Sequence, residues 1–369
     1  MDQTKIADST LRKFARTWLW PLRFALILLI PLSMLDALRF GRASGMPNLF
    51  AFWPLFVNYV ILTTIDYAVG QDRSQPGADV REIPLYKFIA LAALPVHLLA
   101  LGWGLHVFTS ADFSWIGKLG WILSTGAITG TVAITAGHEL VHRPTRLEQW
   151  CGGLLLSSVC YGGFKIEHVY GHHVNVATPA DASSARFGQS VYAFLPRAIW
   201  CNTRNAWRLE AQRLQRRGKS PWRNEMIFWT ACSVGFAALA TLVWGPAGLL
   251  FFVAQSVVAF TELEIINYVE HYGLSRRRTT TGYERVAPCH SWNSSYRMMN
   301  WFLLNLARHS DHHAAASRRY QELRHMDDAP QLPGGYGAML MLALVPPLWF
   351  RIINPRVPAA SVALSNGLY

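Results

Sequence analysis

Residues 226–260 form a run of 35 residues that contains no Asp, Glu, Lys or Arg. A single membrane crossing needs about 20 mostly apolar residues, so this run is too long for one span. A Gly-Pro-Ala-Gly sequence at 245–248 interrupts it near its middle. We therefore expect a helical hairpin in the membrane, with one arm at 225–244 and the other at 248–269.

Four further apolar stretches precede this run, at 18–38, 48–69, 87–109 and 115–136. Six stretches of this length argue against the alternative of buried helices in a large soluble protein. Only 15% of the residues are charged, whereas a typical soluble domain has about 25%. The first stretch lacks the small-residue cleavage site of a signal peptide. We therefore expect an all-α fold, a bundle of six transmembrane helices.

The basic residues predict which side of the membrane each segment occupies. With the N-terminus inside, the segments 1–17, 70–86, 137–224 and 270–369 are cytoplasmic. The loops on the other side carry only Arg39 and Arg42, whereas 137–224 alone carries twelve Lys and Arg, as the positive-inside rule requires. We expect 137–224 and 270–369 to form a cytoplasmic helical cap, and 1–369 to be a single domain, because no repeat or linker divides it.

The basic cytoplasmic face also accounts for the net charge of +12 without a nucleic-acid partner, for which the chain has no reader motif. The five cysteines include no CxxC pair and no regular spacing. This pattern excludes a disulfide framework, a zinc ribbon and a fused rubredoxin-type iron site.

Nine of the thirteen histidines crowd into four short segments. They are His138 and His142; His168, His172 and His173; His271; and His309, His312 and His313. On a helix, residues four apart share one face, so we expect His138 to lie beside His142 and His168 beside His172. The HExxH segment at 138–142 is also the zinc metalloprotease signature, but a protease needs only one further ligand.

Nine imidazoles are too many for one metal ion and suit two ions with four or five nitrogen ligands each. Imidazole binds Zn, Cu, Fe and Ni, and structural zinc sites usually include Cys. Two ions with open positions beside a membrane favour redox chemistry on oxygen, and iron is our choice. Copper and a dizinc hydrolase stay open. A metal transporter is a further alternative, but its ligands would lie near the membrane midplane rather than beyond the inner ends of the spans.

The segments HELVHRP, EHVYGHHVNVATP, NYVEHYGL and RHSDHHAAASRRYQELR together resemble the integral-membrane alkane 1-monooxygenases of the membrane fatty-acid desaturase/hydroxylase superfamily. The likeness runs from the fourth span to about residue 351. The chain departs from the common pattern at VYGHH, ATPADAS and LARHSDHH. These departures remove no histidine and bear on substrate range.

The resemblance implies a non-haem di-iron centre, that is, two Fe ions, with all nine of these histidines as ligands. It implies reductive O2 activation and hydroxylation of the terminal carbon of medium- or long-chain n-alkanes to 1-alkanols, in a bacterial cytoplasmic (inner) membrane. Methyl hydroxylases of the xylene and cymene type share the scaffold and are the first alternative. A membrane fatty-acid desaturase is the second.

The chain has no flavin, nicotinamide or iron–sulfur motif, so the electrons must come from another protein. The resemblance implies a rubredoxin with its reductase, and a ferredoxin-type donor is the alternative. Such donors tend to be acidic, which matches the basic cytoplasmic face.

Carboxylates near the histidines are candidates for supporting them, because metal-bound imidazoles usually donate their other N–H to an acceptor. The candidates are Glu139, Glu264 and Asp311, followed by Glu167, Glu270 and Asp181. Glu264 carries the most weight, since it lies in an apolar span. For the substrate, we expect an apolar tunnel between the spans, with Trp53 at its far end near the outer leaflet; an interfacial Trp is the alternative.

Overall fold

A computed structural model of the chain describes residues 15–77 and 80–365. The regular secondary structure of these residues is helical apart from one antiparallel hairpin, β1 (Arg278–Thr279) with β2 (Gly282–Tyr283), and two isolated bridges; irregular segments join the helices. The all-α prediction is therefore confirmed for the described part of the chain.

The helices, with η marking 3-10 and π turns, have the following bounds. In the N-terminal half they are η1 (Ala15–Leu19), α2 (Trp20–Leu22), η2 (Arg23–Leu28), α3 (Leu32–Ser44), α4 (Pro47–Phe50), α5 (Trp53–Phe56), η3 (Val57–Ile61), α6 (Leu62–Val69), η4 (Val80–Glu82), α7 (Pro84–Ser110), α8 (Trp115–Thr129), η5 (Gly130–Ile134), α9 (Thr135–Val141), α10 (Arg146–Ser157), α11 (Phe164–Glu167), η6 (His168–His172) and α12 (His173–Asn175). They continue as α13 (Val191–Arg216), η7 (Pro221–Arg223), α14 (Glu225–His271), η8 (Pro288–His290), α15 (Arg297–Phe302), α16 (His309–Ala314), η9 (Tyr320–Glu322), α17 (Tyr336–Ala343), α18 (Pro346–Ile353), η10 (Asn354–Arg356) and α19 (Ala359–Ser365).

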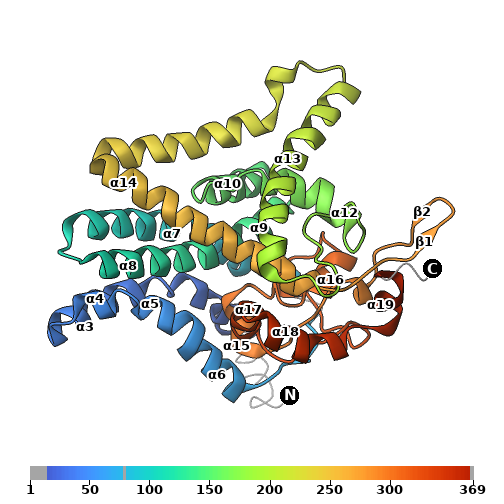
Figure 1. The fold of residues 1–369 in the computed structure, drawn as a ribbon, viewed down its shortest axis with the longest axis horizontal. Coiled ribbons are helices and arrows are strands. Elements are labelled where there is room, and N and C mark those ends of the chain that lie inside the picture. Colours follow the sequence, from blue (N-terminus) through green and yellow to red (C-terminus); the bar gives the residue numbers. More distant parts are fainter. Residues whose placement is uncertain (1–14, 78–79, 366–369) are drawn as a thin grey trace, which may run out of the picture.

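Three long apolar helices pack side by side and form one half of the molecule (Figure 1). They are α7, the continuous helix from α8 through η5 to α9, and α14. Polar N-caps start two of them: Ser114 Oγ accepts from Gly117 N, and Asn224 Oδ1 accepts from Met226 N. Such caps satisfy backbone donors that would otherwise lack partners.

The 47-residue α14 consists of two arms, as the Gly-Pro-Ala-Gly sequence predicts. Gly245 has φ 68° and ψ −165°, a backbone conformation that L side chains rarely adopt, and Pro246 follows it. Figure 1 shows the second arm returning beside the first. A straight helix of this length would span about 70 Å, roughly twice the hydrocarbon core of a bilayer.

The first two predicted spans are less regular. Residues 17–28 and 32–44 form helices that meet at 54°, and residues 47–69 form the short α4 followed by a continuous helix from α5 through η3 to α6. Prolines at 31, 47 and 54 account for these breaks, because proline cannot continue the hydrogen-bond ladder. Within the described residues, three helices are long and apolar enough to cross a membrane, or four with the bent pair. The count of six spans stays a prediction.

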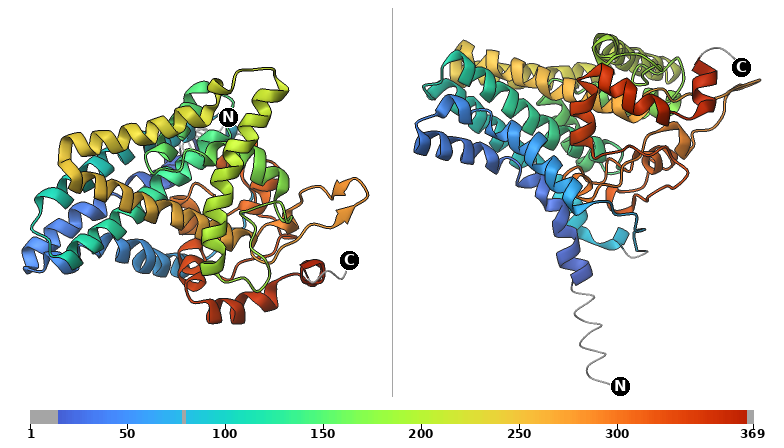
Figure 2. Two further views of the ribbon diagram at one scale, coloured as in Figure 1. Left: turned by 45° about the horizontal axis from the view of Figure 1, so that its top comes forward. Right: turned by 60° about the horizontal axis from the view of Figure 1, so that its bottom comes forward.

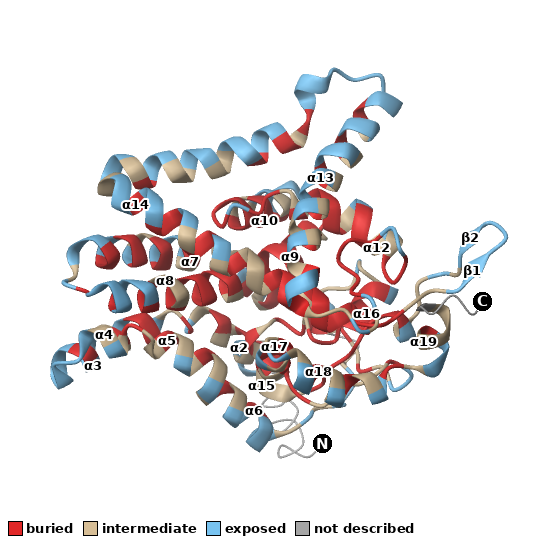
Figure 3. Ribbon diagram, viewed as in Figure 1, coloured by how far each residue is buried: buried red, intermediate tan, exposed pale blue. Residues whose placement is uncertain are grey.

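The outer face of the long helices exposes large apolar side chains, including Leu242 at 84%, Val234 at 62% and Leu250 at 61%. Exposed apolar surface of this extent fits contact with lipid. The other half of the molecule holds α10 to α13 and α15 to α19, arranged around one end of the long helices (Figure 2). The most deeply buried elements, among them α9 and α16, lie where the two halves meet (Figure 3).

Candidate metal centre

Nine histidines from four segments of the chain meet where the long helices join the other half of the molecule. They belong to α9 and the residue after it, to η6 and α12, to the C-terminal end of α14, and to α16. One group of five contains His138, His142, His168, His173 and His312, and one group of four contains His172, His271, His309 and His313. Within each group, one ligand atom from every histidine lies within 4.8 Å of the others.

A π-turn explains how the HxxxHH segment supplies both groups. Residues 168–172 are π-helical, and the backbone N–H of His173 donates to the carbonyl of His168, five residues earlier. His168 therefore shares a group with His173, whereas His172 turns into the other group. His168 and His172 lie side by side as expected, with ring centroids 5.2 Å apart, but they belong to different groups. Single π-turns inside helices often mark functional sites.

The Nε2 atoms converge within each group. In the group of five, Nε2 of His173 lies 3.1 Å from Nε2 of His168 and 3.1 Å from that of His312. In the group of four, Nε2 of His309 lies 3.1 Å from that of His271 and 3.0 Å from that of His313. A ring nitrogen carries either one proton or one lone pair. Nε2 of His309 can therefore hydrogen-bond with only one of its two neighbouring Nε2 atoms, and the same holds for Nε2 of His173.

Two further nitrogens in the group of five, Nε2 of His138 and Nε2 of His142, are buried without a hydrogen-bond partner. Buried polar atoms without partners are rare and costly. Together with the crowded Nε2 atoms, they fit a cage for metal ions rather than a hydrogen-bonded core. Purely nitrogen donors suit Fe, Zn, Cu or Ni and not Mg or Ca, so the donor set fits iron.

Burial, and after it the neighbouring imidazoles, lowers the pKa of six of these histidines well below the ordinary value. They are His142, His168, His173, His309, His312 and His313. An imidazole binds a metal ion only in its neutral form. The site therefore keeps these rings in the form that binds metal.

Two carboxylates contact the far side of imidazoles in the group of four. Nδ1 of His172 lies 2.9 Å from Oδ2 of Asp181, and Nδ1 of His309 lies 3.2 Å from Oε1 of Glu270. Tyr336 in turn donates its hydroxyl to Glu270 at 2.8 Å. Asp181 orients His172 with Nε2 toward the centre of the group. Nδ1 of His309 lies near Glu270 but forms no hydrogen bond within the described chain.

Asp181 is held by further donors and is buried. Its carboxylate accepts from the backbone N of Ser183 at 3.1 Å and from Oγ of Ser184 at 2.6 Å. Burial alone would raise the pKa of Asp181, but the attraction of His172 and the hydrogen bonds from His172 and Ser184 lower it below its ordinary value. Asp181 thus remains an ionised acceptor for His172.

Glu264, the favoured candidate from the sequence, lies on the apolar arm of α14 and is fully buried. Its carboxylate accepts from the Tyr161 hydroxyl, from Nδ2 of Asn202 at 3.0 Å and from Nδ2 of Asn267 at 3.2 Å. Within the described chain it has no hydrogen bond to an imidazole. Its contacts join α14 to α13 and to the residues before α11.

Glu139 and Asp311 contact arginines instead of histidine rings. Glu139 Oε1 lies 3.2 Å from Nε of Arg143, and that guanidinium also donates to the carbonyls of Ser317 and Arg318. Asp311 pairs with two arginines, at 318 and 324. These ion pairs fasten the segment after α16 to α9 and so position the last three histidines.

Trp53 lies in an aromatic cluster on the half of the molecule that holds the long helices. Its ring centroid is 5.3 Å from that of Phe40, 6.0 Å from that of Phe50 and 5.7 Å from that of Phe56. The indole is partly buried, and its Nε1 has no hydrogen-bond partner in the described chain. Trp53 thus lies on the apolar side of the molecule, away from the histidines.

A small cavity of about 70 Å³ is lined by residues of η3, η5, α9, α14, α15 and α17. Thr135 and Leu306, each three residues before a histidine of the centre, line it together with Asn58 and Thr131. Asn58 and Thr131 connect the π-turns η3 and η5, because Asn58 Nδ2 donates to Thr131 Oγ1 at 3.3 Å.

The sequence analysis missed Glu262, whose Oε2 reaches this cavity and is buried without a hydrogen-bond partner. The signal that selected Glu264, an acid within an apolar span, applies equally to Glu262. Tyr336 was also missed, and no local pattern could have found it, because it reaches Glu270 from 66 residues away in the chain.

Comparison with known proteins agrees with this geometry. Residues 113–343 match the fatty acid desaturase family. The chain is 49% identical over 352 residues to alkane 1-monooxygenase 2 of Pseudomonas aeruginosa, which covers 93% of this chain and 91% of that protein. It is 48% identical over 340 residues to alkane 1-monooxygenase 2 of Alcanivorax borkumensis, and this match covers 90% of this chain and 89% of that protein. The xylene/toluene monooxygenase hydroxylase component of Pseudomonas putida is 32% identical over 63% of the chain.

The chain is therefore a metal-dependent membrane oxidoreductase of the fatty acid desaturase family. Within that class it belongs to the alkane 1-monooxygenases and is an alkane-hydroxylating enzyme. The resemblance drawn from the four histidine segments is confirmed.

Proposed function

We propose that this enzyme hydroxylates the terminal carbon of medium- or long-chain n-alkanes to 1-alkanols at a centre of two Fe ions bound by all nine histidines. The observation that carries the proposal is the division of the nine imidazoles into groups of five and four, each with converging ring nitrogens. One group of this size supplies enough nitrogen ligands for a single ion, so two groups favour two ions.

The reaction joins one oxygen atom of O2 to the terminal carbon and reduces the other to water, consuming two electrons and two protons. Two bound iron ions would supply the redox chemistry that activates O2. The chain supplies ring orientation through Asp181. Glu139, Glu264 and Asp311 act in this proposal as positioning residues, through the ion pairs and hydrogen bonds that hold α9, α14 and α16 together.

An n-alkane has no polar group, so its binding depends on burial of hydrocarbon, at about 0.8 kcal/mol for each CH2. We place the substrate in an apolar tunnel that starts at the small cavity beside Thr135 and Leu306 and ends at Trp53. In support, two residues that line the cavity, Thr135 and Leu306, each lie three residues before a histidine of the centre, and Trp53 packs against Phe40 among the apolar helices.

The proposed location is a bacterial inner membrane, with the histidines on the cytoplasmic side and the electrons delivered by an external rubredoxin with its reductase, or by a ferredoxin-type donor. The distribution of Lys and Arg supports this orientation. The basic cytoplasmic segments suit an acidic donor.

Turnover of an n-alkane series by membranes containing the enzyme and a reconstituted donor, analysed by gas chromatography, tests the substrate. Formation of 1-alkanols is expected, and products from toluene or cymene alone would favour an alkyl-aromatic methyl hydroxylase, to which the similarity to the xylene/toluene enzyme points. An alkene product would indicate a desaturase.

Metal analysis of the detergent-purified enzyme tests the centre separately. We expect about two Fe per chain. One metal per chain, or stoichiometric zinc in an active preparation, would contradict the di-iron assignment.

A further inference from the structure

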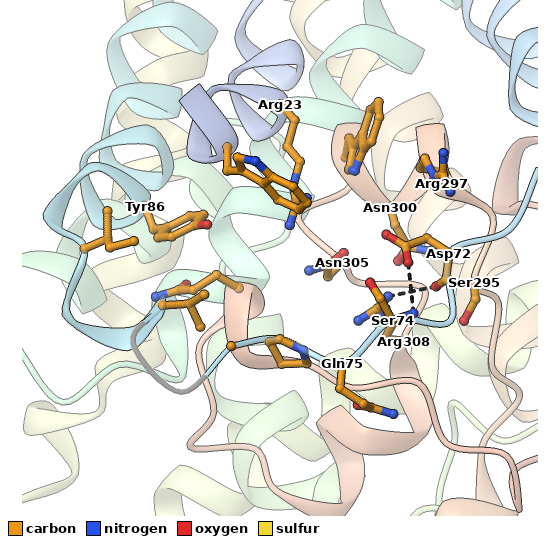
Figure 4. A pocket seen from close by; sticks show the side chains of 17 residues that line it. Arg23, Asp72, Ser74, Gln75, Tyr86, Ser295, Arg297, Asn300, Asn305 and Arg308 are labelled. Carbon is orange, nitrogen blue, oxygen red and sulfur yellow. Dashed lines mark hydrogen bonds between the residues drawn. The ribbon is translucent and has the colours of Figure 1, made fainter. Parts of the chain in front are cut away.

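A cavity of about 540 Å³, distinct from the histidine centre, lies between the start of the first apolar helices and the segments around α15 (Figure 4). Three arginines line it: Arg23 from η2, Arg297 from α15 and Arg308 just before α16. Figure 4 shows their side chains on different sides of the same space. The volume is in the range of small-ligand sites.

Arg23 has no hydrogen bond or ion pair to any described residue. Its guanidinium lies 4.8 Å from the ring of Trp20 and 4.9 Å from that of Phe24, and its Nε is buried without a partner. Aromatic rings stabilise a cation from one side only. The five N–H donors of this guanidinium therefore lack acceptors within the described chain.

Arg308 and Arg297 are only partly satisfied. Arg308 is 7% exposed; its Nη1 donates to the carbonyl of Leu323 at 2.8 Å and its Nη2 to the carbonyl of Asp72 at 2.9 Å, while its Nε has no partner. Within the described chain, the one side-chain hydrogen bond of Arg297 is long, at 3.5 Å from Nη2 to the carbonyl of Gln71. Carbonyl acceptors do not neutralise these charges.

The lining includes one carboxylate, Asp72, against three guanidinium groups. Its Oδ1 accepts from the backbone N of Ser74 at 2.9 Å. No ion pair within 4.0 Å joins Asp72 to the three arginines in the described chain. Counted over the described residues that line it, the cavity holds two uncompensated positive charges, partly shielded from water, which is unfavourable unless an anion enters it.

We propose that this cavity binds the phosphate group of an anionic glycerophospholipid. A lipid is favoured over a soluble anion because the surface beside the cavity is apolar and exposed: Trp20 is 55% exposed and Leu22 is 49% exposed. Acyl chains would lie along these apolar side chains while the phosphate meets Arg23, Arg297 and Arg308. Basic pockets beside membrane helices recognise anionic headgroups in this way, and Trp residues favour the same membrane depth.

The test measures lipid retention by the full-length enzyme. The wild type, reconstituted in nanodiscs of phosphatidylcholine with phosphatidylglycerol, is extracted in mild detergent and analysed by native mass spectrometry. We expect about one retained phosphatidylglycerol per chain and no retained phosphatidylcholine. Arg23→Gln and Arg297→Gln should each reduce retention at least fivefold, whereas Arg39→Gln, which removes an exposed arginine elsewhere on the membrane helices, should not.

Iron content, measured in each variant, separates loss of the lipid from misfolding. Equal retention of both lipids, or unchanged retention in correctly folded Arg23→Gln and Arg297→Gln, would overturn the proposal. A competition arm uses inorganic phosphate at millimolar concentration. If phosphate binds the wild type but not the arginine variants, and phosphatidylglycerol does not displace it, the occupant is a soluble anion and the lipid assignment is wrong.

Discussion

Nδ1 of His172 and Oδ2 of Asp181 lie 2.9 Å apart, on the side of the imidazole that faces away from the other histidines. Nε2 of the same ring lies 3.2 Å from Nε2 of His313. The carboxylate thus fixes which nitrogen faces the centre. The contact spans nine residues of irregular chain, so the loop after α12 is part of the metal site although it supplies no histidine.

Asp181→Asn tests this role. The amide keeps the size of the side chain but loses the charge that favours an Nδ1–H donor on His172. We expect metal affinity or turnover to fall about 10- to 100-fold, as is usual when such a partner is lost. Iron content and kcat are measured together, with Asp328→Asn, an exposed aspartate, as the control. Unchanged values in Asp181→Asn would show that the ring is oriented by packing alone.

His271→Ala removes a ligand from the group of four and leaves the group of five complete. We expect iron content to fall by about one ion per chain and hydroxylation to be lost, while membrane insertion stays intact because it depends on the apolar helices. His138→Ala, His172→Ala and His312→Ala should also abolish turnover. His106→Ala, at an exposed position on α7, is the control. Retained hydroxylation in His271→Ala would remove this residue from the ligand set.

The four histidine segments could be predicted from the sequence because their chemistry is local. A repeated histidine spacing signals metal binding without knowledge of the fold. The division of the histidines into two groups could not be predicted, because it depends on the π-turn at 168–172. No residue in that segment distinguishes a π-turn from an α-turn. The spacing correctly placed His172 beside His168, but it could not show that the two rings belong to different groups.

Prediction of the membrane helices from hydropathy was similarly limited. Hydropathy located α7, the helix from α8 to α9 and both arms of α14, where the apolar runs are long. It did not foresee that a turn at 51–52 would separate α4 from the helix at 53–69. The cavity at Arg23, Arg297 and Arg308 was not foreseen either, because these arginines are far apart in the chain and each alone resembles a solvated charge.

The acid stability of the enzyme should depend on Glu148. This buried carboxylate accepts from Thr145 Oγ1 at 2.6 Å and from Arg319 Nη1 at 2.7 Å, and Lys87 Nζ lies 3.6 Å away. Burial opposes ionisation, but the hydrogen bonds from Arg319 and Thr145 and the nearby positive charges lower the pKa of Glu148 below its ordinary value of 4.5. Because the folded state binds this proton less readily than the unfolded chain, the stabilisation is complete above that value and is lost as the pH falls through the folded pKa.

Glu148→Gln is therefore expected to lower the Tm at pH 7, with a difference from the wild type that shrinks below about pH 4.5. Thermal unfolding in detergent across this pH range measures it. Glu82→Gln, at an exposed position, should leave the Tm unchanged at every pH. A constant difference between Glu148→Gln and the wild type would mean that packing, not charge, explains the effect.

α8 packs closely against α14 at Gly126, because glycine has no side chain. A Cβ at Gly126 would lie 2.4 Å from Cβ of Val258 and 2.9 Å from the carbonyl oxygen of Gln255. Gly126→Ala should separate the two helices and cost about 1–3 kcal/mol. Gly102→Ala is the matched control, because no heavy atom lies within 4 Å of its added Cβ. An equal Tm for both variants would show that the interface adapts.

Trp53→Ser is expected to shift the substrate profile toward longer alkanes. If the indole closes the far end of the tunnel, serine opens space for several methylenes, and each buried CH2 favours binding by about 0.8 kcal/mol while the enlarged tunnel stays dry. Relative turnover of short and long n-alkanes is compared at matched enzyme level in the wild type, Trp53→Ser and Trp115→Ser. Trp115 is 75% exposed, so its replacement should leave the profile unchanged. If Trp53 only anchors the chain at the membrane interface, Trp53→Ser lowers the Tm or the expression level and keeps the wild-type profile. That outcome would rule out the tunnel role and leave the di-iron assignment untouched.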